Sequence, residues 1–70
     1  MNTRFAVCTN NKGFEASLNV GKLYEVVPDE EAERDGMLRV VDEDGEDYLF
    51  EASIFYPLVI PAELAQVLHP

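Results

Sequence analysis

Apolar and polar residues alternate with a period of two in several short runs of the chain, a pattern that predicts β-strands. In the first run, residues 4–9, Phe5 and Val7 lie on one face. The second run, residues 22–27, is rich in β-branched and aromatic residues and stops before Pro28, which has no N–H group for a strand ladder. We therefore expect two strands separated by a long polar loop, with Phe14 and Leu18 of the loop turned inward.

Residues 29–36 carry a weaker signal. Asp29 is a residue type that caps helices, and Gly36 is suited to end one, because glycine adopts a positive φ without strain. Only Ala32 is apolar in the helical turn that these two residues would enclose. The segment is therefore predicted to be a solvated loop.

The clearest local prediction is a β-hairpin over residues 37–50. Two strand-like runs flank Asp44-Gly45, a dipeptide that favours a tight turn. If these two residues form the loop, the cross-strand pairs are Val41 with Tyr48, Val40 with Leu49, and Arg39 with Phe50.

The end of the chain predicts a short turn, a last strand and a helix. The turn covers residues 52–55 and the strand residues 56–60, in which Pro57 indicates an edge position. Pro61 begins a tail, residues 61–69, where apolar residues recur at helical spacing. The apolar side of this short amphipathic helix would consist of Leu64, Val67 and Leu68.

Length and composition indicate one domain of 70 residues, with 47% hydrophobic residues available for a single core. The only cysteine, Cys8, has no internal disulfide partner and is expected to be a small buried hydrophobe. The chain does not begin like a secretion signal, and its longest apolar stretch, residues 54–61, is far shorter than the ~20 residues that cross a bilayer. We expect a cytoplasmic protein with no membrane partner.

Two strings, GKLYEV at residues 21–26 and RVVDEDGEDYLF at residues 39–50, resemble small uncharacterised bacterial proteins with a Src-homology-3-like barrel. The five short strands, long first loop and tight hairpin of residues 4–60 share this resemblance. It implies an all-β fold, a small five-stranded barrel, to which residues 61–69 would add a short C-terminal helix. Proline-peptide-binding domains of this fold use a groove that contains tryptophan, and this chain has none, so no binding residue is carried over.

Charge narrows the range of partners. Fourteen acidic and five basic residues give a net charge of −9, which repels the phosphates of nucleic acids. The same charge favours a basic protein or a divalent cation, and it also keeps a small protein soluble. We expect no nucleic-acid partner.

The acidic hairpin tip is the first candidate site, and its residues are Asp42, Glu43, Asp44, Glu46 and Asp47. The expected register sets like charges opposite one another, which destabilises a strand pair. Three interpretations remain open: a solvated tip that prevents edge association, a docking point for a basic partner, and a divalent-cation site. A second acidic cluster, residues 29–35, is expected at the opposite end of the barrel, about 20 Å away.

The apolar end of the chain is the second candidate site, formed by Leu58, Ile60, Leu64, Val67 and Leu68. These residues either cover the open end of the barrel or form an interface with a second copy or another protein.

Catalytic and cofactor signatures are not recognisable in the sequence. The only histidine, His69, lies beside the C-terminus, and no Cys/His metal spacing or phosphate-binding glycine loop is present. We predict a non-enzymatic protein-interaction module without cofactor, which binds another protein or itself. The alternatives are a divalent-cation-responsive protein that uses the acidic hairpin, and an acidic mimic of nucleic acid that binds a basic protein.

Overall fold

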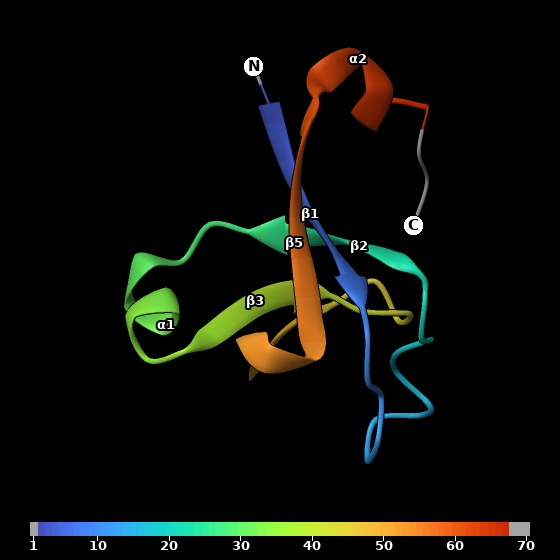
Figure 1. Cartoon of the computed structure of the whole chain (residues 1–70), viewed down its shortest axis with the longest axis vertical. Coiled ribbons are helices and arrows are strands. Elements are labelled where there is room, and N and C mark those ends of the chain that lie inside the picture. The colour runs from blue at the N-terminus through green and yellow to red at the C-terminus, as the bar shows by residue number, and fades with distance from the viewer. Residues whose placement is uncertain (1, 68–70) are drawn as a thin grey trace.

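The computed structural model describes residues 2–67 (Figure 1), and side chains from residue 4 onward. Its elements in chain order are β1 (Asn2–Cys8), β2 (Leu23–Val27), α1 (Glu30–Arg34), β3 (Met37–Val41), β4 (Asp47–Glu51), the 3₁₀ turn η1 (Ala52–Ile54), β5 (Phe55–Pro61) and α2 (Ala62–Ala65). The fold is therefore mainly β, as predicted.

The five strands form one antiparallel sheet in the order β4-β3-β2-β1-β5. Strand β2 pairs with β1 through its first residues, Leu23 to Glu25, and with β3 through its last, Val26 and Val27. In Figure 1, β1 and β5 consequently run side by side across the direction of β2 and β3. The sheet ends at β4 and β5 and is open, which differs from the closed barrel that the sequence predicted.

The core lies on one face of β1 and β2. Ala6 and Cys8 of β1 and Tyr24 of β2 are at most 1% exposed and belong to the main hydrophobic cluster. Phe5 and Val7 do share a face, as expected, but it is the opposite face of β1, since neighbouring residues of a strand point to opposite sides. Phe5 is also buried there, at 4% exposure, outside the main cluster. The prediction that Cys8 is a buried hydrophobe is confirmed.

The first loop contributes one core residue rather than two. Leu18 is fully buried, but Phe14 is 44% exposed, so the inward placement of Phe14 was wrong. The two residues belong to one turn, in which the N–H of Leu18 donates to the carbonyl of Phe14 at 2.9 Å. The ring of Phe14 instead meets the ring of Phe50 edge-on, with centroids 5.2 Å apart.

Residues 30–34 form the helix α1, so the predicted solvated loop was wrong. Oδ1 of Asp29 accepts a hydrogen bond from the N–H of Ala32 at 3.0 Å and caps the helix. Ala32, the only apolar residue of the turn, is 6% exposed. One buried side chain is sufficient here because tertiary ion pairs, described below, hold the same segment.

The hairpin forms as predicted, but its register differs by one residue. The observed pairs are Val41 with Asp47, Val40 with Tyr48, Arg39 with Leu49, and Leu38 with Phe50. The cause is a three-residue loop: the N–H of Asp42 donates to the carbonyl of Glu46, and the N–H of Gly45, at φ +79°, donates to the carbonyl of Asp42, both at 3.0 Å. The like-charge pairs expected from a two-residue loop, Asp42 with Asp47 and Glu43 with Glu46, do not form, but the observed register sets Asp42 opposite Glu46 instead.

The last segment follows the prediction in its turn and strand, but its helix is shorter than expected: α2 ends at Ala65, so Val67 lies outside it. The turn η1 leads into β5, and Pro57 lies on an edge strand. The helix α2 begins directly after Pro61 and lies near the N-terminal end of β1. Leu68 and His69 lie outside the described residues. Within residues 2–67, no helix is long and apolar enough to cross a membrane.

Candidate partner-binding surfaces

Glu43, at the hairpin tip, is bound by three residues of the preceding part of the chain. Its carboxylate accepts hydrogen bonds from Lys22 Nζ at 2.8 Å, the Tyr24 hydroxyl at 2.5 Å and Asn19 Nδ2 at 3.1 Å. These contacts, led by the bond from Lys22, lower the pKa of Glu43. The side chain thus joins the tip to the first loop and to β2.

Tyr24 is the buried member of this contact. Its ring is 1% exposed, and its hydroxyl also accepts a hydrogen bond from the N–H of Asn19 at 2.7 Å. Burial and then the hydrogen bond to Glu43 raise the pKa of Tyr24 to about 12. The neutral phenol therefore connects the core to the acidic tip.

Asp42 is also turned inward, at 6% exposure. Its Oδ1 accepts the N–H of Asp44 at 2.9 Å, which fixes the turn. Of the five predicted acidic site residues, Asp42 fixes the turn and Glu43 joins the tip to the rest of the chain. Glu43, Asp44, Glu46 and Asp47 are all exposed at the tip, and the contacts of Glu46 and Asp47 are described below.

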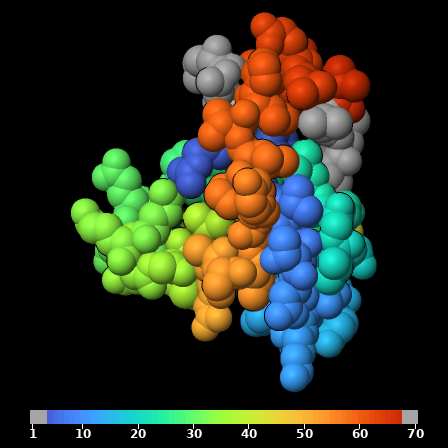
Figure 2. Space-filling view, in the orientation of Figure 1, coloured from blue at the N-terminus to red at the C-terminus, as the bar shows by residue number. Residues whose placement is uncertain are grey.

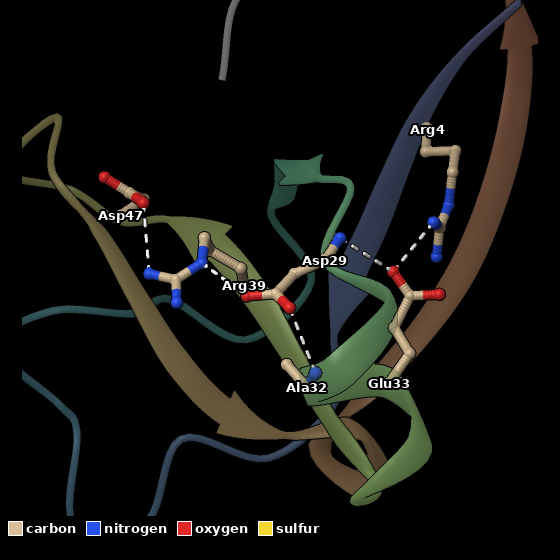
Figure 3. A network of polar contacts seen from close by, with 6 residues as sticks. All are labelled: Arg4, Asp29, Ala32, Glu33, Arg39 and Asp47. Atoms are coloured by element: carbon tan, nitrogen blue, oxygen red, sulfur yellow. Dashed lines mark hydrogen bonds and ion pairs between the residues drawn. The ribbon is translucent and has the colours of Figure 1, made fainter.

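Arg39 links the two acidic clusters (Figure 3). Its Nε donates to Oδ2 of Asp29 at 2.9 Å, and its Nη1 donates to Oδ2 of Asp47 at 3.3 Å. The prediction that the two clusters occupy opposite ends of the molecule was therefore wrong for these two carboxylates. A long arginine in the middle of β3 reaches a carboxylate of each cluster, which an estimate from the length of the strand alone did not include.

A second ion pair holds the other side of α1. Nη1 of Arg4 in β1 donates to Oε2 of Glu33 at 3.0 Å, and the same oxygen accepts the N–H of Asp29 at 3.3 Å (Figure 3). The bond from Arg4 lowers the pKa of Glu33. The pKa of Asp29 is lowered first by the N–H of Ala32 and then by Arg39.

A hollow of about 290 Å³ opens between the first loop and β4. We call it the β4 hollow; its lining residues are Phe14, Ser17, Asp42, Asp44, Tyr48, Leu49 and Phe50. Phe14, Tyr48 and Leu49 are 44%, 49% and 45% exposed. Aromatic faces beside carboxylates suit a cationic side chain, which is attracted by both.

The other candidate surface is an apolar ridge on β5 and the tail. Its exposed residues are Tyr56, Leu58, Val59, Leu64 and Val67. Figure 2 shows β5 and α2 as one continuous column along the near face. Of the predicted residues, Leu58, Leu64 and Val67 are exposed, Ile60 is half-buried, and Leu68 lies outside the described part of the chain.

The cation hypothesis receives no geometric support from the part of the chain that is described. Within it, no three histidine, cysteine, aspartate or glutamate side chains group closely enough to hold a metal ion. The tip acids diverge, with Glu43 bound to Lys22, Asp47 to Arg39, and Glu46 to the hydroxyl of Tyr48 at 2.7 Å.

The sequence interpretation missed the aromatic part of the β4 hollow. Phe14 was assigned to the core, and Tyr48 and Leu49 were treated only as members of the hairpin. The sequence DYLFE was a usable signal, because three successive apolar residues of a strand cannot all face one core, and only Phe50 is buried here. Comparisons of this chain with known protein families, with curated proteins and with solved structures found no match.

Proposed function

We propose that this chain is a non-enzymatic protein-interaction module with an open variant of the Src-homology-3-like barrel, and that it binds a basic protein partner at the β4 hollow. The long first loop, the tight hairpin and the 3₁₀ turn before the last strand support the fold. Since this fold hosts many functions, the proposed function depends on the surface alone.

The observation that carries the proposal is the combination of exposed aromatic rings with carboxylates in one hollow. Phe14 and Tyr48 offer ring faces for a lysine or arginine, and Asp44 offers an opposite charge. The net charge of −9 would also accelerate the approach of a basic partner. An acidic mimic of nucleic acid would use the same surface and is included in this proposal as a binder of basic proteins.

The test is a titration of the ¹⁵N-labelled chain with a short arginine-rich peptide. We expect shifts of the Phe14 and Tyr48 amides, and binding that weakens between about 50 mM and about 500 mM salt, because screening removes much of the attraction. Tyr48→Ala should weaken binding about tenfold. Tyr56→Ala is the matched control, since Tyr56 is an exposed tyrosine, at 64%, on another strand.

Two results would overturn the proposal. One is no amide shift at millimolar peptide. The other is a loss of binding in Tyr56→Ala that equals or exceeds the loss in Tyr48→Ala.

Self-association is the second candidate function, and the apolar ridge favours it. The segment from Phe55 to Val67 contains a single charged residue, Glu63, so two copies could meet there despite their net charge. Sedimentation equilibrium tests this candidate. A concentration-dependent dimer that Leu58→Asp dissociates would support it, and a monomer at millimolar concentration would exclude it.

A further inference from the structure

The two edges of the sheet differ in their capacity to accept another strand. The N–H of Asp42 in the hairpin loop donates to the carbonyl of Glu46, so these two residues form a hydrogen-bonded pair. Such pairs recur at every second residue of the β3–β4 ladder. The backbone groups of Tyr48 and Phe50 therefore point toward β3, and those of Asp47, Leu49 and Glu51 point out of the sheet. No described segment pairs with this outer side of β4.

At β5 the corresponding edge is blocked by proline. The N–H of Thr9 donates to the carbonyl of Ile54 at 2.8 Å, and hydrogen-bonded pairs recur at every second residue of an antiparallel ladder. Tyr56, which pairs with Val7, and Leu58, which pairs with Phe5, therefore also direct their backbone groups toward β1. The outward positions are consequently Phe55, Pro57, Val59 and Pro61. Two of these four have no N–H group, which is a known protection of edge strands.

The open edge lies between two acidic hollows. The β4 hollow lies on the side of Tyr48 and Phe50. The second, of about 250 Å³, is lined by Asp29, Glu31, Ala32, Asp35, Arg39 and Leu49. An added strand alternates its side chains between the two faces of the sheet, so its residues would enter both hollows in turn.

Asp42 marks the point in the β4 hollow where a cation fits. The residue is 6% exposed and lines the hollow, and its Oδ1 accepts a hydrogen bond from Asp44. Among the described residues no buried side-chain oxygen lacks a partner, so Oδ2 of Asp42 is accessible to solvent. A lysine or arginine that passes between Phe14 and Tyr48 would donate to this carboxylate in place of water.

Charge also selects between a basic partner and a second copy at this edge. If two β4 strands paired antiparallel about Leu49, Asp47 of each copy would face Glu51 of the other, and like charges directly opposite are destabilising. The nearest cation, Arg39, is already bound to Asp29 and Asp47. An extended basic segment meets no such repulsion.

We infer that β4 binds an extended basic segment of the partner protein by strand addition, with a lysine or arginine of that segment entering the β4 hollow toward Asp42. This inference rests on the proposed function and adds its mode of recognition. The backbone of Asp47, Leu49 and Glu51 supplies affinity, and the two acidic hollows supply the preference for basic side chains.

The experiment uses the intact chain and a short peptide in which lysine and valine alternate. The matched control peptide has the same sequence and charge, but its valine nitrogens are methylated, which removes N–H donors without touching the protein. We expect the control to bind about tenfold or more weakly, because the strand ladder loses its hydrogen bonds. The amides of Asp47, Leu49 and Glu51 should become protected from hydrogen exchange only with the unmethylated peptide.

Variants of the chain separate backbone from side chain. Leu49→Pro removes an outward N–H at a position equivalent to that of Pro57 in β5, whereas Leu49→Ala keeps the N–H and shortens the side chain. Leu49→Pro should weaken binding about tenfold relative to Leu49→Ala. Asp42→Asn should weaken binding of the lysine peptide while keeping the acceptor that fixes the turn.

The outcomes distinguish this inference from the proposed function. If both peptides bind equally, strand addition is wrong while the basic-partner proposal stands. If neither peptide binds at millimolar concentration, both fail. If Leu49→Pro does not fold, the comparison of the methylated and unmethylated peptides still tests strand addition, because it uses the wild-type chain. A dimer that forms through β4, seen as exchange protection that grows with chain concentration alone, would also overturn the inference.

Discussion

The guanidinium of Arg39, in the middle of β3, donates a hydrogen bond to the carboxylate of Asp29, the residue that caps α1. The distance is 2.9 Å, and the same arginine also reaches Asp47 of β4. One side chain therefore fixes a helix start and two strands. The same contact orders the second acidic hollow beside the edge of β4.

Replacement of Asp29 should separate capping from ion pairing. Asp29→Asn keeps a side-chain acceptor for the N–H of Ala32 but removes the charge that binds Arg39, and Asp29→Ala removes both. We expect the midpoint of urea unfolding to fall in the order wild type, Asn, Ala. A midpoint for Asn equal to that for Ala would show that the cap contributes nothing.

Acid should destabilise the fold through the same carboxylates. The pKa values of Asp29, Glu33 and Glu43 are lowered from ordinary values of 3.8, 4.5 and 4.5 by hydrogen bonds and cationic partners. Their stabilisation is thus present above these values and is lost as the pH falls through the lower folded-state pKa values. Urea unfolding between pH 7 and pH 2 measures this, and Glu33→Gln should flatten part of the decline.

A side chain at Gly45 should destabilise the hairpin loop. The φ of Gly45, +79°, lies in the left-handed region, and no atom lies within 4 Å of the position that a Cβ would take. The cost of Gly45→Ala is therefore conformational, about 1 kcal/mol of unfolding free energy. Gly45→Asn should cost less, because asparagine enters this region more readily. Equal losses for the two variants would contradict this explanation.

Sequence patterning was sufficient for the strands but not for the contacts between them. The alternation around Phe5, Val26 and Val40 predicted strands within about two residues of those observed. The hairpin register was wrong because the Asp44-Gly45 dipeptide suits both a two-residue loop and the observed three-residue loop, in which only Gly45 has a positive φ.

The helix and the site depended on partners that are distant in sequence. α1 is marginal by composition and is held by Arg4 and Arg39, which lie 29 and 10 residues from their acidic partners. Glu43 looked like a free surface acid because Lys22 and Tyr24, its partners, are about 20 residues earlier. Local patterns carry no information on such pairs.

The two apolar residues of the first loop should differ in their contribution to stability. Leu18 is fully buried, so Leu18→Ala should lower the unfolding free energy by about 2–5 kcal/mol through lost burial and a cavity. Phe14 is 44% exposed, so Phe14→Ala should cost less, while it removes a ring from the β4 hollow. Chemical denaturation of both variants measures this. The reverse order would mean that Phe14 is the loop residue that anchors the core.

Alkaline pH should weaken the fold through Tyr24. Because its pKa is about 12 in the folded chain and 10.0 in the ordinary state, the unfolded chain loses the phenolic proton first. The stabilisation is complete below pH 10 and is lost as the pH rises toward 12. At neutral pH, Tyr24→Phe should be less stable by about 1–3 kcal/mol, because the N–H of Asn19 and the carboxylate of Glu43 each lose a partner.

The pH dependence of the unfolding free energy of Tyr24→Phe isolates the contribution of the buried hydroxyl, because the variant keeps the aromatic ring. The stability difference between wild type and Tyr24→Phe should narrow between pH 10 and 12, since phenylalanine has no proton to release in either state. Tyr56→Phe, at a residue 64% exposed, controls for the loss of a hydroxyl and should match wild type at neutral pH. A difference that stays constant to pH 12 would show that the Tyr24 phenol ionises equally easily in both states, and that its bond to Glu43 does not persist in solution.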